Sequence, residues 1–134
     1  MGFRETIMEF EGKIDRFFNA RDIVIFGASS GGKEALEILK FLNRSPSYFT
    51  DNDRKKWGTE IEGVKVIPPE ELKALNPDII IIGSTVYEDE MVEQIESYGL
   101  GDRIVVMDFL ELLMVGKVLT KIFEKFKKYC PDDE

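Results

Sequence analysis

Residues 23–34 read Ile-Val-Ile-Phe-Gly-Ala-Ser-Ser-Gly-Gly-Lys-Glu, and this stretch decides the fold class of the chain. The apolar run at residues 23–26 predicts a buried strand, because strands of a parallel sheet are covered on both faces. A glycine-rich turn follows, and a helical pattern of apolar residues then runs to about Asn43. Such a turn leaves free backbone amides at the positive end of the helix, which is a site for phosphate groups.

The rest of the chain alternates short apolar runs with amphipathic segments. These patterns predict strands at residues 48–50, 64–67, 79–82 and 104–107, and helices at residues 69–76 and 88–98. Residues 51–63 predict a polar loop. Strands that alternate with helices are joined by right-handed crossovers, so they lie parallel, with helices on both faces of the sheet. We therefore expect an α/β fold of three αβα layers around a mostly parallel sheet of roughly 4–5 strands.

Two further helices are predicted at residues 3–18 and 109–129, outside this alternation. Each has apolar residues spaced alternately three and four apart. The N-terminal stripe is Phe3, Ile7, Phe10, Ile14 and Phe17, and the C-terminal stripe is Leu112, Val115, Leu119, Ile122, Phe126 and Tyr129. The two stripes pack on each other within the chain, or they build the interface of a homo-oligomer, or the basic C-terminal helix lies on a membrane. We expect residues 1–134 to form a single domain with its core at about residues 20–108.

The glycine-rich turn resembles two classes of phosphate site. Read as Gly-x4-Gly-Lys, it has Gly27, Gly32 and Lys33 at the positions used by ATP- and GTP-hydrolysing proteins. That class needs Ser or Thr next, to ligate magnesium, and this chain has Glu34. Its metal-holding aspartate would have to be Asp108, which follows the last predicted strand rather than an early one. This alternative is therefore the weaker one.

Read as Gly-x-Gly-x-x-Gly, the turn matches the dinucleotide-binding loop of Rossmann folds. Gly27 and Gly32 take the first and third positions of this motif. In the motif the second glycine lets a pyrophosphate approach the backbone, and here Ser29 stands at that position. The amides at the start of the helix still point to where a phosphate would sit. This interpretation predicts a phosphate site at Gly27, Ser29, Ser30, Gly31, Gly32 and Lys33.

An acidic group at the end of the second strand favours the Rossmann-like interpretation. Asp51 lies 19 residues after Gly32, and that class carries a ribose-binding acid about 20 residues beyond its glycines. Asp51, Asn52 and Asp53 are therefore predicted to contact a nucleoside. The alternatives are a solvated turn or a calcium loop, and the calcium pattern fails at Lys55–Trp57, where it needs a ligand and a glycine. Gly83, Ser84 and Thr85 follow the strand at residues 79–82, where a ligand would pass. They are further candidates for ligand contact, or they form a helix start.

Composition narrows the functional classes. The chain has 134 residues, of which 18 are basic and 26 acidic; its net charge is −8, so we expect no nucleic acid as a partner. It has no histidine and a single cysteine, Cys130, which argues against histidine-dependent catalysis, most metal sites and an internal disulfide. No apolar run could span a bilayer, and the amino terminus does not read as a signal peptide. We expect a soluble, cytoplasmic protein without a metal.

Several segments agree in order with a known group of proteins: Val24–Lys33, Phe49–Asp53, Lys56–Gly58, Ile61–Pro68 and Pro77–Ser84. They resemble the small Rossmann-like nucleotide-binding modules of bacterial polysaccharide-biosynthesis proteins. These include the amino-terminal domain of sugar O-acyltransferases that bind a UDP-sugar, nucleotide-sugar dehydratase-type proteins, and appended domains of some methyltransferases. The resemblance covers about residues 20–108.

The resemblance implies roles for the same residues. In the acyltransferases the glycine turn holds the diphosphate and the acidic residues after the second strand meet the nucleoside. This assigns Ser29–Lys33 to phosphate and Asp51–Asp53 to base or ribose, with NAD(P) or a UDP-sugar as the bound cofactor. The chain departs from the acyltransferases at Gly31, where they carry a histidine, and it lacks their β-helix with the acetyl-CoA site. What remains is the binding module.

Three functions agree with these residues. The first, which we favour, is a non-catalytic nucleotide, dinucleotide or nucleotide-sugar binding module that acts alone or as the partner subunit of an enzyme of sugar or polysaccharide metabolism. The second is an NAD(P)- or UDP-sugar-dependent enzyme with Asp53, Tyr87 or Lys33 in an acid–base role. The third is a scaffold that works through its two helical stripes and has lost its ligand. The first two predict a nucleotide-type small molecule as the ligand.

Overall fold

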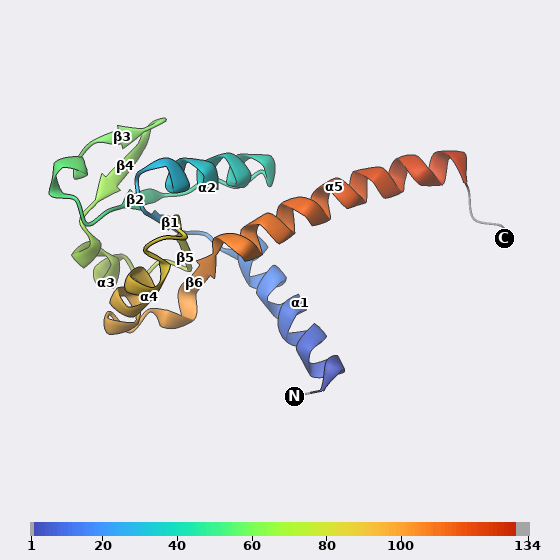
Figure 1. Ribbon diagram of the computed structural model, residues 1–134, viewed down its shortest axis with the longest axis horizontal. Coiled ribbons are helices and arrows are strands. Elements are labelled where there is room, and N and C mark those ends of the chain that lie inside the picture. The colour runs from blue at the N-terminus through green and yellow to red at the C-terminus, as the bar shows by residue number, and fades with distance from the viewer. Residues whose placement is uncertain (1, 131–134) are drawn as a thin grey trace.

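The computed structural model describes residues 2–130, and a six-stranded sheet forms its centre (Figure 1). Its elements in chain order are α1 (Phe3–Asn19), β1 (Ile23–Phe26), α2 (Ser30–Phe41), β2 (Tyr48–Thr50), β3 (Glu60–Ile61), β4 (Val64–Ile67), α3 (Leu72–Leu75), β5 (Ile79–Ile82), α4 (Glu88–Ser97), β6 (Ile104–Val106) and α5 (Met107–Tyr129). Single turns of 3-10 helix lie at Arg54–Lys56, Pro69–Glu71 and Gly101–Arg103.

Strand β1 lies inside the sheet, whose strand order is β3-β4-β2-β1-β5-β6. It pairs in parallel with β2, where Ile25 is opposite Phe49, and with β5, where Ile25 is opposite Ile81. The pairs β2–β4 and β5–β6 are parallel too, whereas the edge strand β3 runs antiparallel to β4. From β1 the chain adds strands toward one edge of the sheet, and from β5 it adds them toward the other edge. The direction therefore reverses between β1 and β5, which is the topological switch point of the sheet. The predicted Rossmann-like, mostly parallel fold is confirmed.

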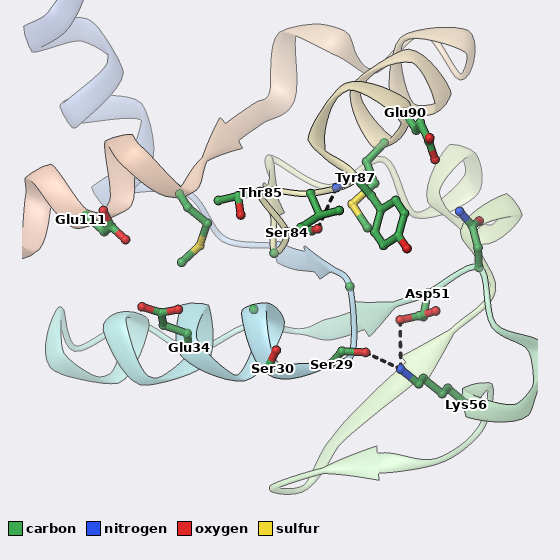
Figure 2. A pocket seen from close by; sticks show the side chains of 17 residues that line it. Ser29, Ser30, Glu34, Asp51, Lys56, Ser84, Thr85, Tyr87, Glu90 and Glu111 are labelled. Carbon is green, nitrogen blue, oxygen red and sulfur yellow. Dashed lines mark hydrogen bonds and ion pairs between the residues drawn. The ribbon is translucent and has the colours of Figure 1, made fainter.

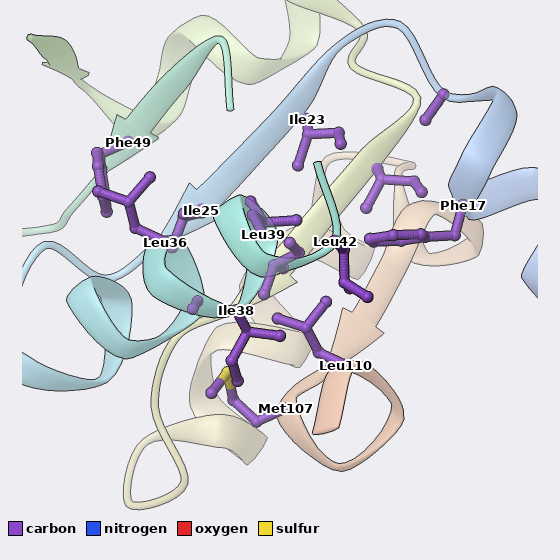
Figure 3. Packing of buried hydrophobic residues seen from close by; sticks show 14 of the residues in the cluster. Phe17, Ile23, Ile25, Leu36, Ile38, Leu39, Leu42, Phe49, Met107 and Leu110 are labelled. Carbon is purple, nitrogen blue, oxygen red and sulfur yellow. The ribbon is translucent and has the colours of Figure 1, made fainter. Parts of the chain in front are cut away.

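Both faces of the sheet are covered, because successive residues of the central strands point to opposite cores. One core packs against α1, α2 and α5 and receives the isoleucines of alternate positions (Figure 3), namely Ile23, Ile25, Ile79 and Ile81. The other core packs against α3 and α4 and receives Val24, Phe26, Ile80 and Ile82. None of these eight side chains is more than 2% exposed. Burying each of them stabilises the fold by about 1.5–3 kcal/mol.

The region predicted as a polar loop contains a short hairpin. Strand β3 pairs with the start of β4, and the residues between them, Glu62 and Gly63, have positive φ angles of 49° and 83°. Two consecutive residues with positive φ form the tight turn that matches the twist of a hairpin. A strand of two residues shows no alternation of apolar and polar side chains, so the sequence pattern does not reveal it. The sheet therefore has six strands rather than the predicted four or five.

Two helix boundaries also differ from the prediction. The predicted helix at residues 69–76 is a 3-10 turn followed by the short α3, and it ends where Asn76 adopts a left-handed φ of 48°. Helix α5 begins at Met107, which the sequence pattern places at the end of a strand. Met107 is apolar and buried in either setting, so the pattern cannot assign it.

Helices α1 and α5 leave the body of the fold in different directions (Figure 1). They meet where the ring of Phe10 lies edge-on to the ring of Phe109, with centroids 5.7 Å apart. Beyond this contact they diverge, and the residues of the C-terminal stripe are 46% to 72% exposed. The expectation that the two stripes pack on each other within the chain does not hold for most of their length. None of the helices within residues 2–130 combines the length and the apolar content of a bilayer-spanning segment.

The amino-terminal ends of the two central strands are held together by Asp78, which precedes β5. Its Oδ2 accepts hydrogen bonds from the backbone amides of Arg21 (2.8 Å) and Asp22 (3.2 Å), which precede β1. These two amide donors, with that of Arg21 the stronger influence, hold the pKa of the Asp78 carboxyl below its ordinary value. The contact aligns the starts of β1 and β5 beside each other.

At the carboxyl end of the sheet, the turn after β1 packs backbone against backbone on the residue after β5. A Cβ atom on Gly31 would lie 2.2 Å from the carbonyl oxygen of Gly83, and one on Gly32 would lie 1.7 Å from the carbonyl oxygen of Gly27. Gly27 has a φ of 113°, which residues with a side chain rarely adopt. These glycines let the first turn of α2 sit directly on the ends of β1 and β5.

Replacing Gly32 by alanine tests this packing. The added methyl group must displace backbone atoms rather than a flexible side chain, so we expect Gly32→Ala to lower the free energy of unfolding by about 3 kcal/mol, measured by urea denaturation. Gly12→Ala in α1 is the matched control, because its added methyl group meets no atom within 4 Å apart from its own helix backbone, and alanine favours a helix. The control should be at least as stable as the unmodified protein. Equal stability of the two variants would contradict the packing.

Candidate functional site

A cleft of about 730 Å³ opens at the carboxyl ends of β1, β2 and β5, over the switch point of the sheet (Figure 2). Three segments surround it: the turn between β1 and α2, the loop after β2, and the turn between β5 and α4. The start of α5 closes one end with Met107 and Glu111. Ligands of parallel α/β sheets bind in clefts at this position.

Nine of the twelve predicted site residues line this cleft, namely Gly27, Ser29, Ser30, Gly31, Asp51, Asn52, Gly83, Ser84 and Thr85. Gly32 does not, because it is buried under the turn and provides the close packing described above. Lys33 and Asp53 are exposed and do not line the cleft either. Asp53 accepts a hydrogen bond from the amide of Lys55 at 3.0 Å instead. The fold thus gathers predicted residues from three separate segments, and their contact with a ligand stays a prediction.

The first turn of α2 presents free backbone amides to the cleft. The helix begins at Ser30, and the preceding Ser29 makes no side-chain capping bond. The first helical hydrogen bond here runs from the amide of Lys33 to the carbonyl of Ser29, at 3.0 Å. The amides of residues 30–32 precede this bond, so they have no acceptor within the helix, and they lie at the positive end of the helix dipole. Those of Ser30 and Gly31, on the cleft wall, are therefore placed to bind an anion.

Asp51 lies at the end of β2 as predicted, but its carboxylate is already bonded to the protein. Its Oδ2 accepts a hydrogen bond from the amide of Ala28 in the glycine turn, and its Oδ1 accepts one from the amide of Asp53, both at 2.8 Å. The side chain is only 16% exposed. Asp51 therefore holds the glycine turn and the loop after β2 at a set distance. A carboxylate accepts about four hydrogen bonds, so acceptor capacity remains for a ligand hydroxyl.

Lys56 is a cleft residue that the sequence did not identify. Its Nζ lies over the glycine turn, where it donates to Oγ of Ser29 at 2.6 Å and lies 3.7 Å from Oδ2 of Asp51 (Figure 2). The 3-10 turn at Arg54–Lys56 carries it there. The sequence offers Lys33, next to the glycines, as a phosphate partner or as a solvated lysine of the first turn, and in the structure it is exposed and outside the cleft lining. A lysine in a loop lies on no periodic pattern, so only the folded loop shows where it points.

Two other predicted residues have partners within the protein. Asn52 exchanges two hydrogen bonds of 2.9 Å with Gln94 on α4. Oγ of Ser84 accepts a hydrogen bond from the amide of Tyr87 at 3.1 Å, which supports the turn leading into α4. Helix α4 begins at Glu88 with Tyr87 as its N-cap residue, so Ser84 is not the helix cap, and its contact with a ligand stays a prediction. Its hydroxyl can still donate to a ligand.

The remaining wall of the cleft is acidic and apolar. Further carboxylates come from Glu34, Glu90 and Glu111, and apolar surface comes from Val86, Tyr87 and Met91. Glu34 and Glu111 lie at the end of the cleft away from Asp51 and Lys56 (Figure 2). Since like charges repel, these carboxylates disfavour a ligand with a large negative charge.

The geometry does not support the ATP- or GTP-hydrolysing alternative. Lys33 is exposed and does not line the cleft, and Asp108 is exposed in the first turn of α5 rather than at the end of a strand. Among residues 2–130, no three Asp, Glu, Cys or His side chains come together as metal ligands.

The family model described as C2185-like, N-terminal, matches residues 19–106 of the chain. The chain belongs to this family. No curated protein matches the sequence of this C2185-like chain.

Solved structures share the fold at low sequence identity. UDP-D-quinovosamine 4-dehydrogenase from Vibrio fischeri is 23% identical, with a TM-score of 0.50 over 64% of the C2185-like chain and 75% of its own. RSP, a Rex-family repressor, is 16% identical in its complex with β-NADH, with a TM-score of 0.52 over 92% and 72% of the two chains. Its complex with β-NAD+ and operator DNA is 15% identical, with a TM-score of 0.51 over 91% and 69%. At these identities the similarity shows the Rossmann-like fold.

Asp51→Ala should lower the stability of the C2185-like chain even without a ligand. Ala28 is only 6% exposed, and its amide would lose its acceptor, so we expect the free energy of unfolding to fall by about 1–3 kcal/mol in urea denaturation. Asp53→Ala is the control, because it removes an exposed bond to the amide of Lys55 and should cost about 1 kcal/mol or less. An Asp51→Ala variant as stable as the control would show that the carboxylate does not hold the two loops together.

Proposed function

We propose that this C2185-like chain binds a nucleotide-type small molecule, a dinucleotide such as NAD or a nucleotide sugar, and has no chemistry of its own. One observation carries the proposal. The free amides at the start of α2, the ammonium group of Lys56 and the carboxylate of Asp51 all meet at one cleft over the switch point of the sheet. An anion, a sugar hydroxyl and an apolar ring each find a matching group there.

The ligand is oriented by these groups. Its phosphates lie against the amides of Ser30 and Gly31, with Lys56 as the counter-charge. Its ribose lies toward Asp51, whose carboxylate accepts a hydrogen bond from a hydroxyl. The apolar surface of Tyr87, which is 56% exposed on the cleft, covers a ring of the ligand.

Charge favours NAD over NADP in this cleft. A 2′-phosphate on the ribose would meet the carboxylate of Asp51, which repels it. The carboxylates of Glu34, Glu90 and Glu111 repel the larger negative charge of a triphosphate in the same way. The solved structures with this fold support the ligand class, since RSP is found with β-NADH and with β-NAD+ and the Vibrio fischeri protein is named for a UDP-sugar.

A binding module of this kind acts on its own or beside a partner enzyme. The order of segments shared with polysaccharide-biosynthesis modules supports a place in cytoplasmic nucleotide-sugar metabolism.

One observation favours the second candidate, an NAD- or UDP-sugar-dependent enzyme: of the predicted acid–base residues Asp53, Tyr87 and Lys33, Tyr87 lines the cleft. Turnover of a UDP-sugar with NAD that is lost in Tyr87→Phe would select the enzyme over the module.

Ligand binding is tested by thermal shift and titration calorimetry with NAD, NADH, NADP, UDP-sugars, ATP and coenzyme A. We expect NAD, NADH or a UDP-sugar to stabilise the protein, and a ligand at 100 times its dissociation constant adds about 2.7 kcal/mol. NADP and ATP should bind more weakly, because the cleft is acidic. Absence of binding by all six at millimolar concentration would overturn the proposal.

The matched variants for this titration are Lys56→Met and Lys55→Met. Lys56→Met removes the positive charge over the glycine turn, and we expect about tenfold weaker binding, equivalent to about 1.4 kcal/mol. Lys55 is exposed and does not line the cleft, so Lys55→Met should bind like the unmodified protein. Equal weakening in both variants would mean that long-range charge, rather than the contact at the turn, holds the ligand.

A further inference from the structure

A long uncovered apolar surface lies on α5. Eight large apolar side chains are 42% to 72% exposed there: Leu112, Val115, Val118, Leu119, Ile122, Phe123, Phe126 and Tyr129. At about 150–250 Å² for a fully exposed large side chain, they present roughly 800 Å², whereas a monomer seldom exposes a patch of more than a few hundred. About 800 Å² is also what one partner contributes to a protein–protein interface of standard size.

The same part of α5 is basic although the chain as a whole is acidic. Residues 117–129 contain five lysines and one glutamate, a net charge of +4, while the whole chain carries −8. All other residues together therefore carry −12. We call residues 117–129 the distal half of α5. The rest of the chain is complementary to it in charge, and a second copy of the chain can supply that acidic surface.

Helix α1 offers an apolar surface that matches the one on α5. In the N-terminal stripe, Phe3 is 83% exposed and Ile7 is 41% exposed. The helix carries four acidic side chains against three basic ones. Where α1 and α5 diverge, an apolar groove of about 630 Å³ lies between Phe10 and Ile14 on one side and Leu112 and Leu119 on the other. The chain does not close this groove itself, because its α5 runs away from its α1 (Figure 1).

We propose that α1 and α5 join two copies of this chain in a two-fold symmetric dimer. The distal half of α5 from one copy packs on α1 and in the groove of the second copy, and the two-fold axis repeats the same contact. The four helices form a bundle that covers the apolar stripes of both chains. Lys125 and Lys127 flank the stripe on α5, and Glu11 flanks the stripe on α1, so these side chains meet where the two copies pack.

A basic amphipathic helix can also bind a lipid surface, but a second copy fits these observations better. The two stripes lie on diverging helices, so a flat bilayer that covers the stripe on α5 leaves the one on α1 exposed. An anionic bilayer attracts residues 117–129, but it repels the rest of the chain, which carries −12. Two copies related by a two-fold axis cover both stripes and pair the opposite charges.

Sedimentation velocity of the full chain at micromolar concentration tests the dimer. We expect a species of twice the 15.4 kDa chain mass. Phe126→Asp and, separately, Ile122→Asp each place a charge on the stripe and should weaken the dimer at least 100-fold, with unchanged helix content by circular dichroism. Lys128→Asp is the matched control: it lies about 200° around the helix from Phe126 and should stay dimeric.

Three results would overturn the proposal. The first is a monomeric wild type at 100 µM, and the second is a stripe variant that dimerises as well as the wild type. The third is a monomer that floats with vesicles of phosphatidylcholine and phosphatidylglycerol, which would assign α5 to a lipid surface. None of these measurements depends on a bound nucleotide, so they test the dimer separately from the proposed ligand.

Discussion

The fold and its cleft both depend on one close contact, in which the backbone of the turn after β1 lies directly on the backbone after β5. Gly31 and Gly83 meet there without side chains, and Gly32 sits so close to the carbonyl of Gly27 that an added Cβ atom would overlap it. A larger residue would lift the first turn of α2 away from the sheet. The glycines therefore do more than bend the chain, because they bring the free amides of α2 to the point where β1 and β5 separate.

Side chains from the other loops hold the walls of this cleft in place. Asp51 joins the loop after β2 to the glycine turn through the amide of Ala28, and Lys56 reaches the same turn through Ser29. Asn52 ties that loop to α4 through Gln94. A cleft whose walls are already bonded to each other loses little conformational freedom on binding, and this favours affinity for a small ligand.

The strands and helices that surround the cleft could be predicted from the sequence, because they depend on long apolar runs such as residues 23–26 and 79–82. Asp51 could be placed at the end of β2 from its spacing to the glycines, but its bond to Ala28 could not, since a spacing does not show where a carboxylate points. Lys56 and the two-residue strand β3 were missed because neither belongs to a periodic pattern. The divergence of α1 and α5 was missed for another reason: two apolar stripes show that each helix needs a partner but not which partner.

An NMR titration of the ¹⁵N-labelled protein tests the central claim most directly, using the nucleotide that gives the largest thermal shift. If the start of α2 binds the phosphates, the largest saturable changes in chemical shift fall on the amides of Ser30 and Gly31. Saturable binding with its largest changes on another surface, and with these two amides unmoved, would contradict the account.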